Sequence, residues 1–210
     1  MFFFVPDGKH RRPSQKPDFT AFFKVFENKK FRSAAFGYFG HMWELYAFWA
    51  FVPIMLANFS TTHSQTELNI SLLSFFIIAL GGVACVIGGY LSESFGTKKI
   101  AFTALMLSCI CCLVSPLIFM QSSPILLIGF LIFWGLVVIA DSPLFSTLVA
   151  QNAIPESKGT ALTIVNCIGF FITIFSIQLM SYLQTTMDVK YVFMLLAIGP
   201  VLGLMALYRE

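Results

Sequence analysis

The strongest constraint in this sequence is a series of six long apolar stretches separated by short polar segments. A helix needs roughly 20 apolar residues to cross the hydrocarbon core of a bilayer, so each stretch predicts a membrane-spanning helix. Hydrophobic residues make up 58% of the 210-residue chain and charged residues only 11%, whereas a soluble domain carries about 25% charged residues. The predicted fold class is therefore all-α integral membrane. The six predicted spans are residues 33–56, 68–91, 100–120, 124–150, 159–183 and 189–208.

The basic residues are distributed very unevenly between the two predicted sides of the membrane. Twelve of the 13 Lys and Arg residues fall in the N-terminal arm, in loops 92–99 and 151–158, and at the C-terminus; only Lys190 falls on the other side. Because cytoplasmic segments are enriched in Lys and Arg, both termini are predicted to be cytoplasmic, in a multi-pass protein of the cell (inner) membrane. Basic residues this few, and mostly in one stretch, argue against nucleic acid as a partner.

Two regions are predicted, a basic cytoplasmic arm over residues 1–32 and a six-helix transmembrane bundle over residues 33–210. Residues 1–5 look like the tail of a helix whose beginning is missing. Four phenylalanines between residues 19 and 26 repeat at helical spacing, which predicts a short amphipathic helix on the membrane surface; a disordered loop with incidental spacing is the alternative.

The five cysteines lie inside the predicted spans and are interpreted as small apolar residues, so neither a metal site nor a cofactor is predicted.

Three ionisable residues lie inside predicted spans: His41 and Glu44 in the first, and Asp141 in the fourth. A charge near the bilayer centre costs at least about 2.5–3.5 kcal/mol, so such residues usually face a cavity or a partner. At helical spacing, Tyr38, His41, Glu44 and Phe48 share one stripe, and Asp141 falls at the same depth as His41. Either these residues form a substrate or proton site in an aqueous cavity, or they are polar contacts that hold two helices together.

Proline and glycine predict local features of three spans. Ser142-Pro143 interrupts the backbone ladder of the fourth span and predicts a kink there. Faces of small residues allow close helix packing in lipid, and packing is predicted for the glycines of the second and sixth spans. These glycines are Gly81, Gly82, Gly88, Gly89, Gly199 and Gly203.

The loop between the second and third spans resembles the cytoplasmic loop motif of major facilitator superfamily transporters. The residues that carry this resemblance are Gly89, Glu93, Gly96, Lys98 and Lys99. A serine stands where the motif has arginine, as is usual in its second copy between helices eight and nine. The resemblance covers nearly the whole chain and implies the C-terminal half of the family, helices seven to twelve. It also implies that Glu93 pairs with a basic group or a helix N-terminus to hold the outward-facing state.

The resemblance implies a secondary active transporter of a small solute, working by alternating access, with proton coupling through Glu44 as one option. It places the first and fourth spans at the central cavity, with Tyr38, His41, Glu44, Phe48 and Asp141. The expected partners are the lipid bilayer, a small-molecule substrate, and a complementary six-helix half or a second copy. A non-transporting subunit or an inactive truncated remnant is the alternative. An intramembrane enzyme is disfavoured because the chain has no Gly-x-Ser-Gly sequence.

Overall fold

The computed structural model describes residues 25–63 and 67–209, which form helices and no strands. Six segments of this described part are long and apolar enough to cross a membrane, so all six predicted spans are confirmed. The fourth is made of two helices, and the sixth of two helices joined by a 3-10 turn. The helices are α2 (Lys29–Thr62), α3 (Ile70–Phe95), α4 (Thr97–Phe119), α5 (Pro124–Ala140), α6 (Ser142–Asn152), α7 (Lys158–Thr186), α8 (Val189–Val192) and α9 (Ile198–Tyr208), with 3-10 turns at Pro155–Ser157 and Phe193–Ala197.

The first span is longer than predicted at both ends. Its helix begins at Lys29 because Asn28 caps it, with the side-chain oxygen accepting hydrogen bonds from the amides of Lys30 and Phe31. At the other end the helix continues to Thr62. The predicted amphipathic segment and the apolar residues 1–5 lie almost entirely outside the described residues.

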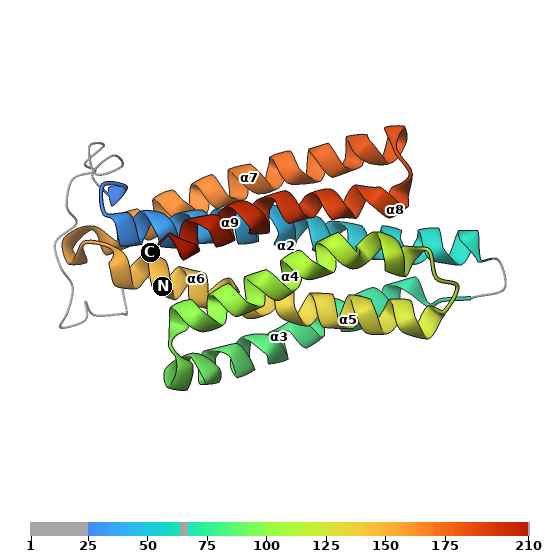
Figure 1. The fold of residues 1–210 in the computed structure, drawn as a ribbon, viewed down its shortest axis with the longest axis horizontal. Helices are drawn as coiled ribbons and strands as arrows, with labels where there is room; N and C mark the ends of the chain where they lie inside the picture. Colours follow the sequence, from blue (N-terminus) through green and yellow to red (C-terminus); the bar gives the residue numbers. More distant parts are fainter. Residues whose placement is uncertain (1–24, 64–66, 210) are drawn as a thin grey trace, which may run out of the picture.

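Helix α2 runs through the middle of the bundle (Figure 1). Helices α7 and α9 pack on one side of it, and α3, α4 and α5 lie on the other (Figure 1). The beginning of α2 and the end of α9 lie at the same end of the bundle (Figure 1). This arrangement surrounds His41 and Glu44 of α2 with protein, so neither has exposed surface.

At the predicted kink the helix is interrupted for one residue, with α5 ending at Ala140 and α6 beginning at Ser142. Pro143 has no amide to donate back to the Ile139 carbonyl. That carbonyl instead accepts from the backbone amide of Asp141 and, at 3.3 Å, from the thiol of Cys85 on α3. Asp141 therefore lies in the break itself, between two helix ends.

The predicted glycine faces behave differently from one another. A Cβ on Gly199 would lie 2.7 Å from the carbonyl oxygen of Gly40, so α2 and α9 cross here in close backbone contact. Gly88 packs in the same way against the backbone of α5, with a Cβ position 3.0 Å from the Ala140 carbonyl oxygen. Gly82 and Gly89 have nothing within 4 Å of the Cβ position. Packing is thus confirmed for the sixth span and for one of the two glycine faces of the second.

Candidate functional site

Glu44 lies at the centre of the bundle with no exposed surface and three hydrogen-bond donors around its carboxyl group. Trp134 Nε1 on α5 donates to Glu44 Oε1 at 2.7 Å, and the Cys112 thiol on α4 donates to the same oxygen at 3.2 Å. The Ser108 hydroxyl on α4 lies 2.9 Å from Glu44 Oε2. One acidic side chain of α2 therefore ties together three helices of the bundle.

Burial without a counter-ion favours the neutral acid form of Glu44, and the hydrogen bonds of the cluster are compatible with it. The Ser108 hydroxyl has one proton but two acceptors in reach, Glu44 Oε2 at 2.9 Å and the Leu105 carbonyl oxygen at 3.0 Å. If Glu44 Oε2 carries a proton, it donates to Ser108, and Ser108 donates to Leu105. Glu44 Oε1 then accepts from Trp134 and Cys112. An ionised Glu44 would also be fully hydrogen-bonded, since it would accept from Ser108, Cys112 and Trp134. Only the neutral acid avoids a buried charge, because no cation of the described residues pairs with Glu44.

His41 and Asp141 form a second buried polar contact toward the beginning of α2. His41 Nδ1 lies 2.9 Å from Asp141 Oδ1, and neither side chain has exposed surface. The angle at this contact is not that of a hydrogen bond, so the contact is an electrostatic pairing when the imidazole is protonated. Among the described residues, none of the four side-chain polar atoms of this pair has a hydrogen-bond partner. The predicted equal depth of the two residues is thus matched by direct contact across α2 and the α5–α6 break.

The other two members of the predicted stripe are aromatic and flank the polar residues. The ring of Tyr38 lies 6.2 Å from that of His41, and the ring of Phe48 lies 4.9 Å from that of Trp134. Phe48 has no exposed surface and Tyr38 only 7%. Helices of the chain itself cover the whole stripe. Its polar residues therefore give no reason to expect a second six-helix bundle to cover them. It also means that solvent reaches Glu44 only when helices move.

The predicted loop motif lies at the turn between α3 and α4. Gly89 and Glu93 are on the last turns of α3, and Lys98 and Lys99 are on the first turn of α4. Gly96 joins the two helices with a backbone φ of 90°, a conformation that residues other than glycine rarely adopt. Glu93 is exposed and forms no ion pair with any residue that the structure describes.

Sequence reasoning missed the three donors to Glu44. Ser108 and Cys112 are four residues apart and thus share a face of α4, which was a usable signal for a polar patch. Cys112 was interpreted as a small apolar residue, yet it is a thiol donor here. Nothing local distinguishes Trp134 from the apolar residues around it on α5.

Comparison with known families gives one match. The family model described as Major Facilitator Superfamily matches residues 34–210. This segment includes all but the first turn of α2 and every other described span, and hence Glu44, the His41–Asp141 pair and the loop motif. No curated protein matches the chain.

Proposed function

We propose that this chain, which belongs to the major facilitator superfamily of transporters, is one six-helix half of a secondary active transporter of a small solute. Alternating access needs two bundles that rock against each other around a site near the midplane. The second bundle is either a complementary six-helix half or a second copy of this chain. The uneven distribution of basic residues supports an orientation with both termini in the cytoplasm.

Glu44 is the proton site of the proposed transporter. The observation that carries this assignment is the complete burial of Glu44 with no ion-pair partner among the described residues, because an uncompensated buried charge is costly and a neutral acid avoids it. Loss of the proton would leave an anion among donors from α4 and α5 with no cation in contact. Deprotonation therefore favours rearrangement of those helices, which is how a proton would be coupled to a change of state.

The His41–Asp141 pair is the proposed tuning element, and the α5–α6 break is the proposed moving part. All four side-chain polar atoms of this pair are buried without a hydrogen-bond partner in the described structure, so a polar solute or a water molecule would complete it. Asp141 is positioned by the break, where the backbone lacks the hydrogen bond that Pro143 cannot make. A movement of α6 relative to α5 would therefore change the distance between Asp141 and His41.

The test uses the purified chain and the variant Glu44→Gln, which keeps the size of the side chain but removes its titratable proton. Infrared difference spectra are recorded between acidic and alkaline pH. We expect the wild type to show the carbonyl band of a buried carboxylic acid and Glu44→Gln to lack it. If the two spectra have the same carboxylic acid band, Glu44 is ionised and the proton assignment is wrong.

The transport part of the proposal is tested in proteoliposomes with a pH-sensitive dye inside and a panel of sugars, amino acids and organic cations outside. Solute-dependent proton movement should be lost in Glu44→Gln and kept in the control Asp188→Asn. Asp188 lies outside the spans, and hydrogen bonding to Lys190 holds the pKa of its carboxyl below the ordinary value. Asparagine still caps a helix, so this control changes an acid to an amide and removes only the surface ion pair with Lys190. Normal proton movement in Glu44→Gln would refute the proposal.

A further inference from the structure

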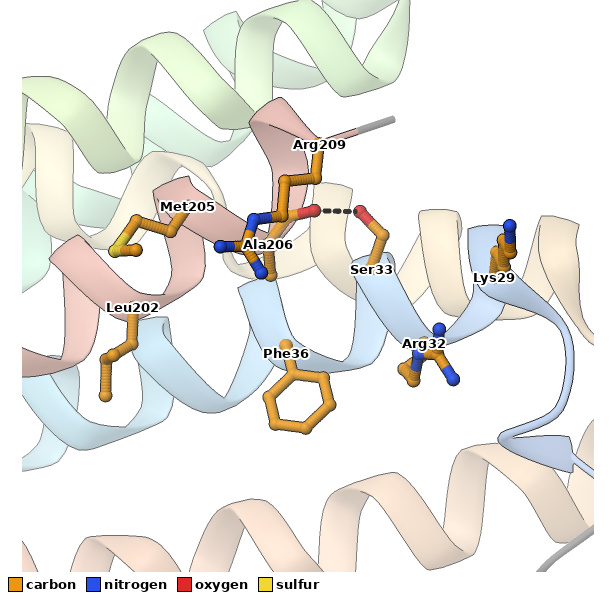
Figure 2. Close-up of a pocket in the computed structure, with 8 residues that line it drawn as sticks. All are labelled: Lys29, Arg32, Ser33, Phe36, Leu202, Met205, Ala206 and Arg209. Carbon is orange, nitrogen blue, oxygen red and sulfur yellow. Dashed lines mark hydrogen bonds between the residues drawn. The ribbon is translucent and has the colours of Figure 1, made fainter.

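Three basic side chains surround a cavity at the end of the bundle where α2 begins and α9 ends. Lys29 and Arg32 come from the first turn of α2, and Arg209 follows the last turn of α9 (Figure 2). The cavity has a volume of about 460 Å³. Its position is fixed by a hydrogen bond of 2.8 Å from the Ser33 hydroxyl to the Ala206 carbonyl oxygen, which joins the two helices (Figure 2).

These three cations form no ion pair with any residue of the described chain. All three side chains line the same cavity, so the cavity is electrostatically complementary to an anion. Seven of the eight Lys and Arg residues that the structure describes belong to this end of the bundle, which is the proposed cytoplasmic end. In the cytoplasmic leaflet, anionic phospholipids are the negative groups that basic residues at this depth encounter.

An apolar groove continues from the basic cavity into the membrane region. The groove has a volume of about 510 Å³ and lies between α2, α7 and α9. Phe36 and Leu202 line both the basic cavity and the groove, so the two spaces adjoin each other. The groove extends along Phe171 and Phe175 of α7 to Trp43 on α2. Leu202 is 60% exposed and Phe36 48% exposed, which leaves the groove open along its length to an acyl chain.

We propose that this composite surface is a binding site for one anionic phospholipid. The phosphate lies among Lys29, Arg32 and Arg209, and one acyl chain lies in the groove as far as Trp43. A free phosphate ion would use only the basic cavity, and a neutral lipid would use only the groove. Because the two spaces adjoin, together they fit a ligand that has both an anionic group and an acyl chain. This inference rests on surfaces separate from Glu44 and does not depend on the transport proposal.

The test measures fluorescence quenching by brominated lipids in nanodiscs of phosphatidylcholine that contain the purified chain. Phosphatidylglycerol or phosphatidylcholine with brominated acyl chains is added at increasing mole fraction. A bromine in the groove quenches Trp43, and the variant Trp43→Phe identifies that part of the signal. We expect phosphatidylglycerol to quench Trp43 at a lower mole fraction than phosphatidylcholine does.

The variants separate this site from general surface charge. Each cation near the membrane surface contributes about fivefold to the affinity for an anionic lipid, so Arg209→Gln should weaken binding about fivefold and Arg32→Gln/Arg209→Gln about 30-fold. The matched control Lys99→Gln/Lys158→Gln removes the same charge at the same end of the bundle, outside the cavity, and should leave the preference unchanged. All four side chains are at the protein surface, so neither double variant removes a buried contact.

Three results would each overturn the proposal. Equal losses in the two double variants would mean that general surface charge attracts the lipid. Equal quenching by the two brominated lipids would mean that Trp43 contacts only bulk lipid. Complete recovery of Trp43 fluorescence on addition of inorganic phosphate would mean that the cavity is a free-anion site.

Discussion

The crossing of α2 and α9 at Gly199 allows a stability prediction with an internal control. A Cβ at position 199 would lie 2.7 Å from the Gly40 carbonyl oxygen, which is backbone and cannot rotate away. Ordinary contacts begin at 3.4 Å, so Gly199→Ala would require the two helices to separate by about 0.7 Å. A gap of roughly 0.5–1 Å forfeits a quarter to a half of the dispersion energy of each contact across it.

The expected cost follows from two opposing terms. Overpacking of this kind typically costs about 1–3 kcal/mol, and we take the upper value because the contact is with backbone. Alanine is about 1 kcal/mol better than glycine inside a helix, which offsets part of the cost. Gly199→Ala should therefore destabilise the bundle by about 2 kcal/mol. The control Gly82→Ala meets nothing within 4 Å and should stabilise it by about 1 kcal/mol.

The assay is thermal unfolding of the two variants in the same mild detergent, followed by circular dichroism. A difference of about 3 kcal/mol corresponds to a Tm gap of about 6–12 °C for a chain of this size. The reasoning is refuted if Gly199→Ala melts at or above the temperature of Gly82→Ala. Equal Tm values would show that α2 and α9 are not held by close backbone contact.

Three further predictions concern the Glu44 cluster, the α5–α6 break and the topology. Trp134→Phe keeps the ring packing but removes the 2.7 Å hydrogen bond to Glu44. Chemical unfolding should show a loss of about 1–3 kcal/mol in the free energy of unfolding. An unchanged free energy of unfolding would contradict the hydrogen bond. Pro143→Ala supplies the missing amide across the break, which should be protected in hydrogen exchange, and rapid exchange there would show that the break does not depend on proline. In a cysteine-free background, a reagent confined to the outside should label Ser122→Cys and not Ser94→Cys; the reverse pattern would invert the proposed orientation.

The sequence predicts the spans well because each depends on a local property, the length of an apolar run. The break at Asp141 also has a local cause. Pro143 removes one backbone hydrogen bond whichever helices lie next to it. The equal depth of His41 and Asp141 is also predictable, because two spans that run in opposite directions bring fixed positions to the same level; depth alone does not place them in contact. These three results need no knowledge of which helices are neighbours.

The partners of Glu44 need that knowledge and were therefore missed. Ser108 and Trp134 are 64 and 90 residues away along the chain, and only the arrangement of α4 and α5 around α2 brings them to the carboxyl group. The glycines of α3 make the same point. Gly81 and Gly88 have the same spacing as Gly82 and Gly89, but only the first pair faces α5.

The position of Glu44 also sets the order in which the chain can be assembled during synthesis. Of the six spans described, α2 is the least hydrophobic and the first to be made. Its carboxyl group finds donors only on α4 and α5, which emerge later from the ribosome. Until then α2 alone offers a buried acid to the lipid, at a cost of about 2.5–3.5 kcal/mol on the scale for insertion by the translocon. Stable insertion of α2 therefore waits for α5, and nascent chains that stop before Trp134 should leave α2 at the insertion machinery, where it can be crosslinked.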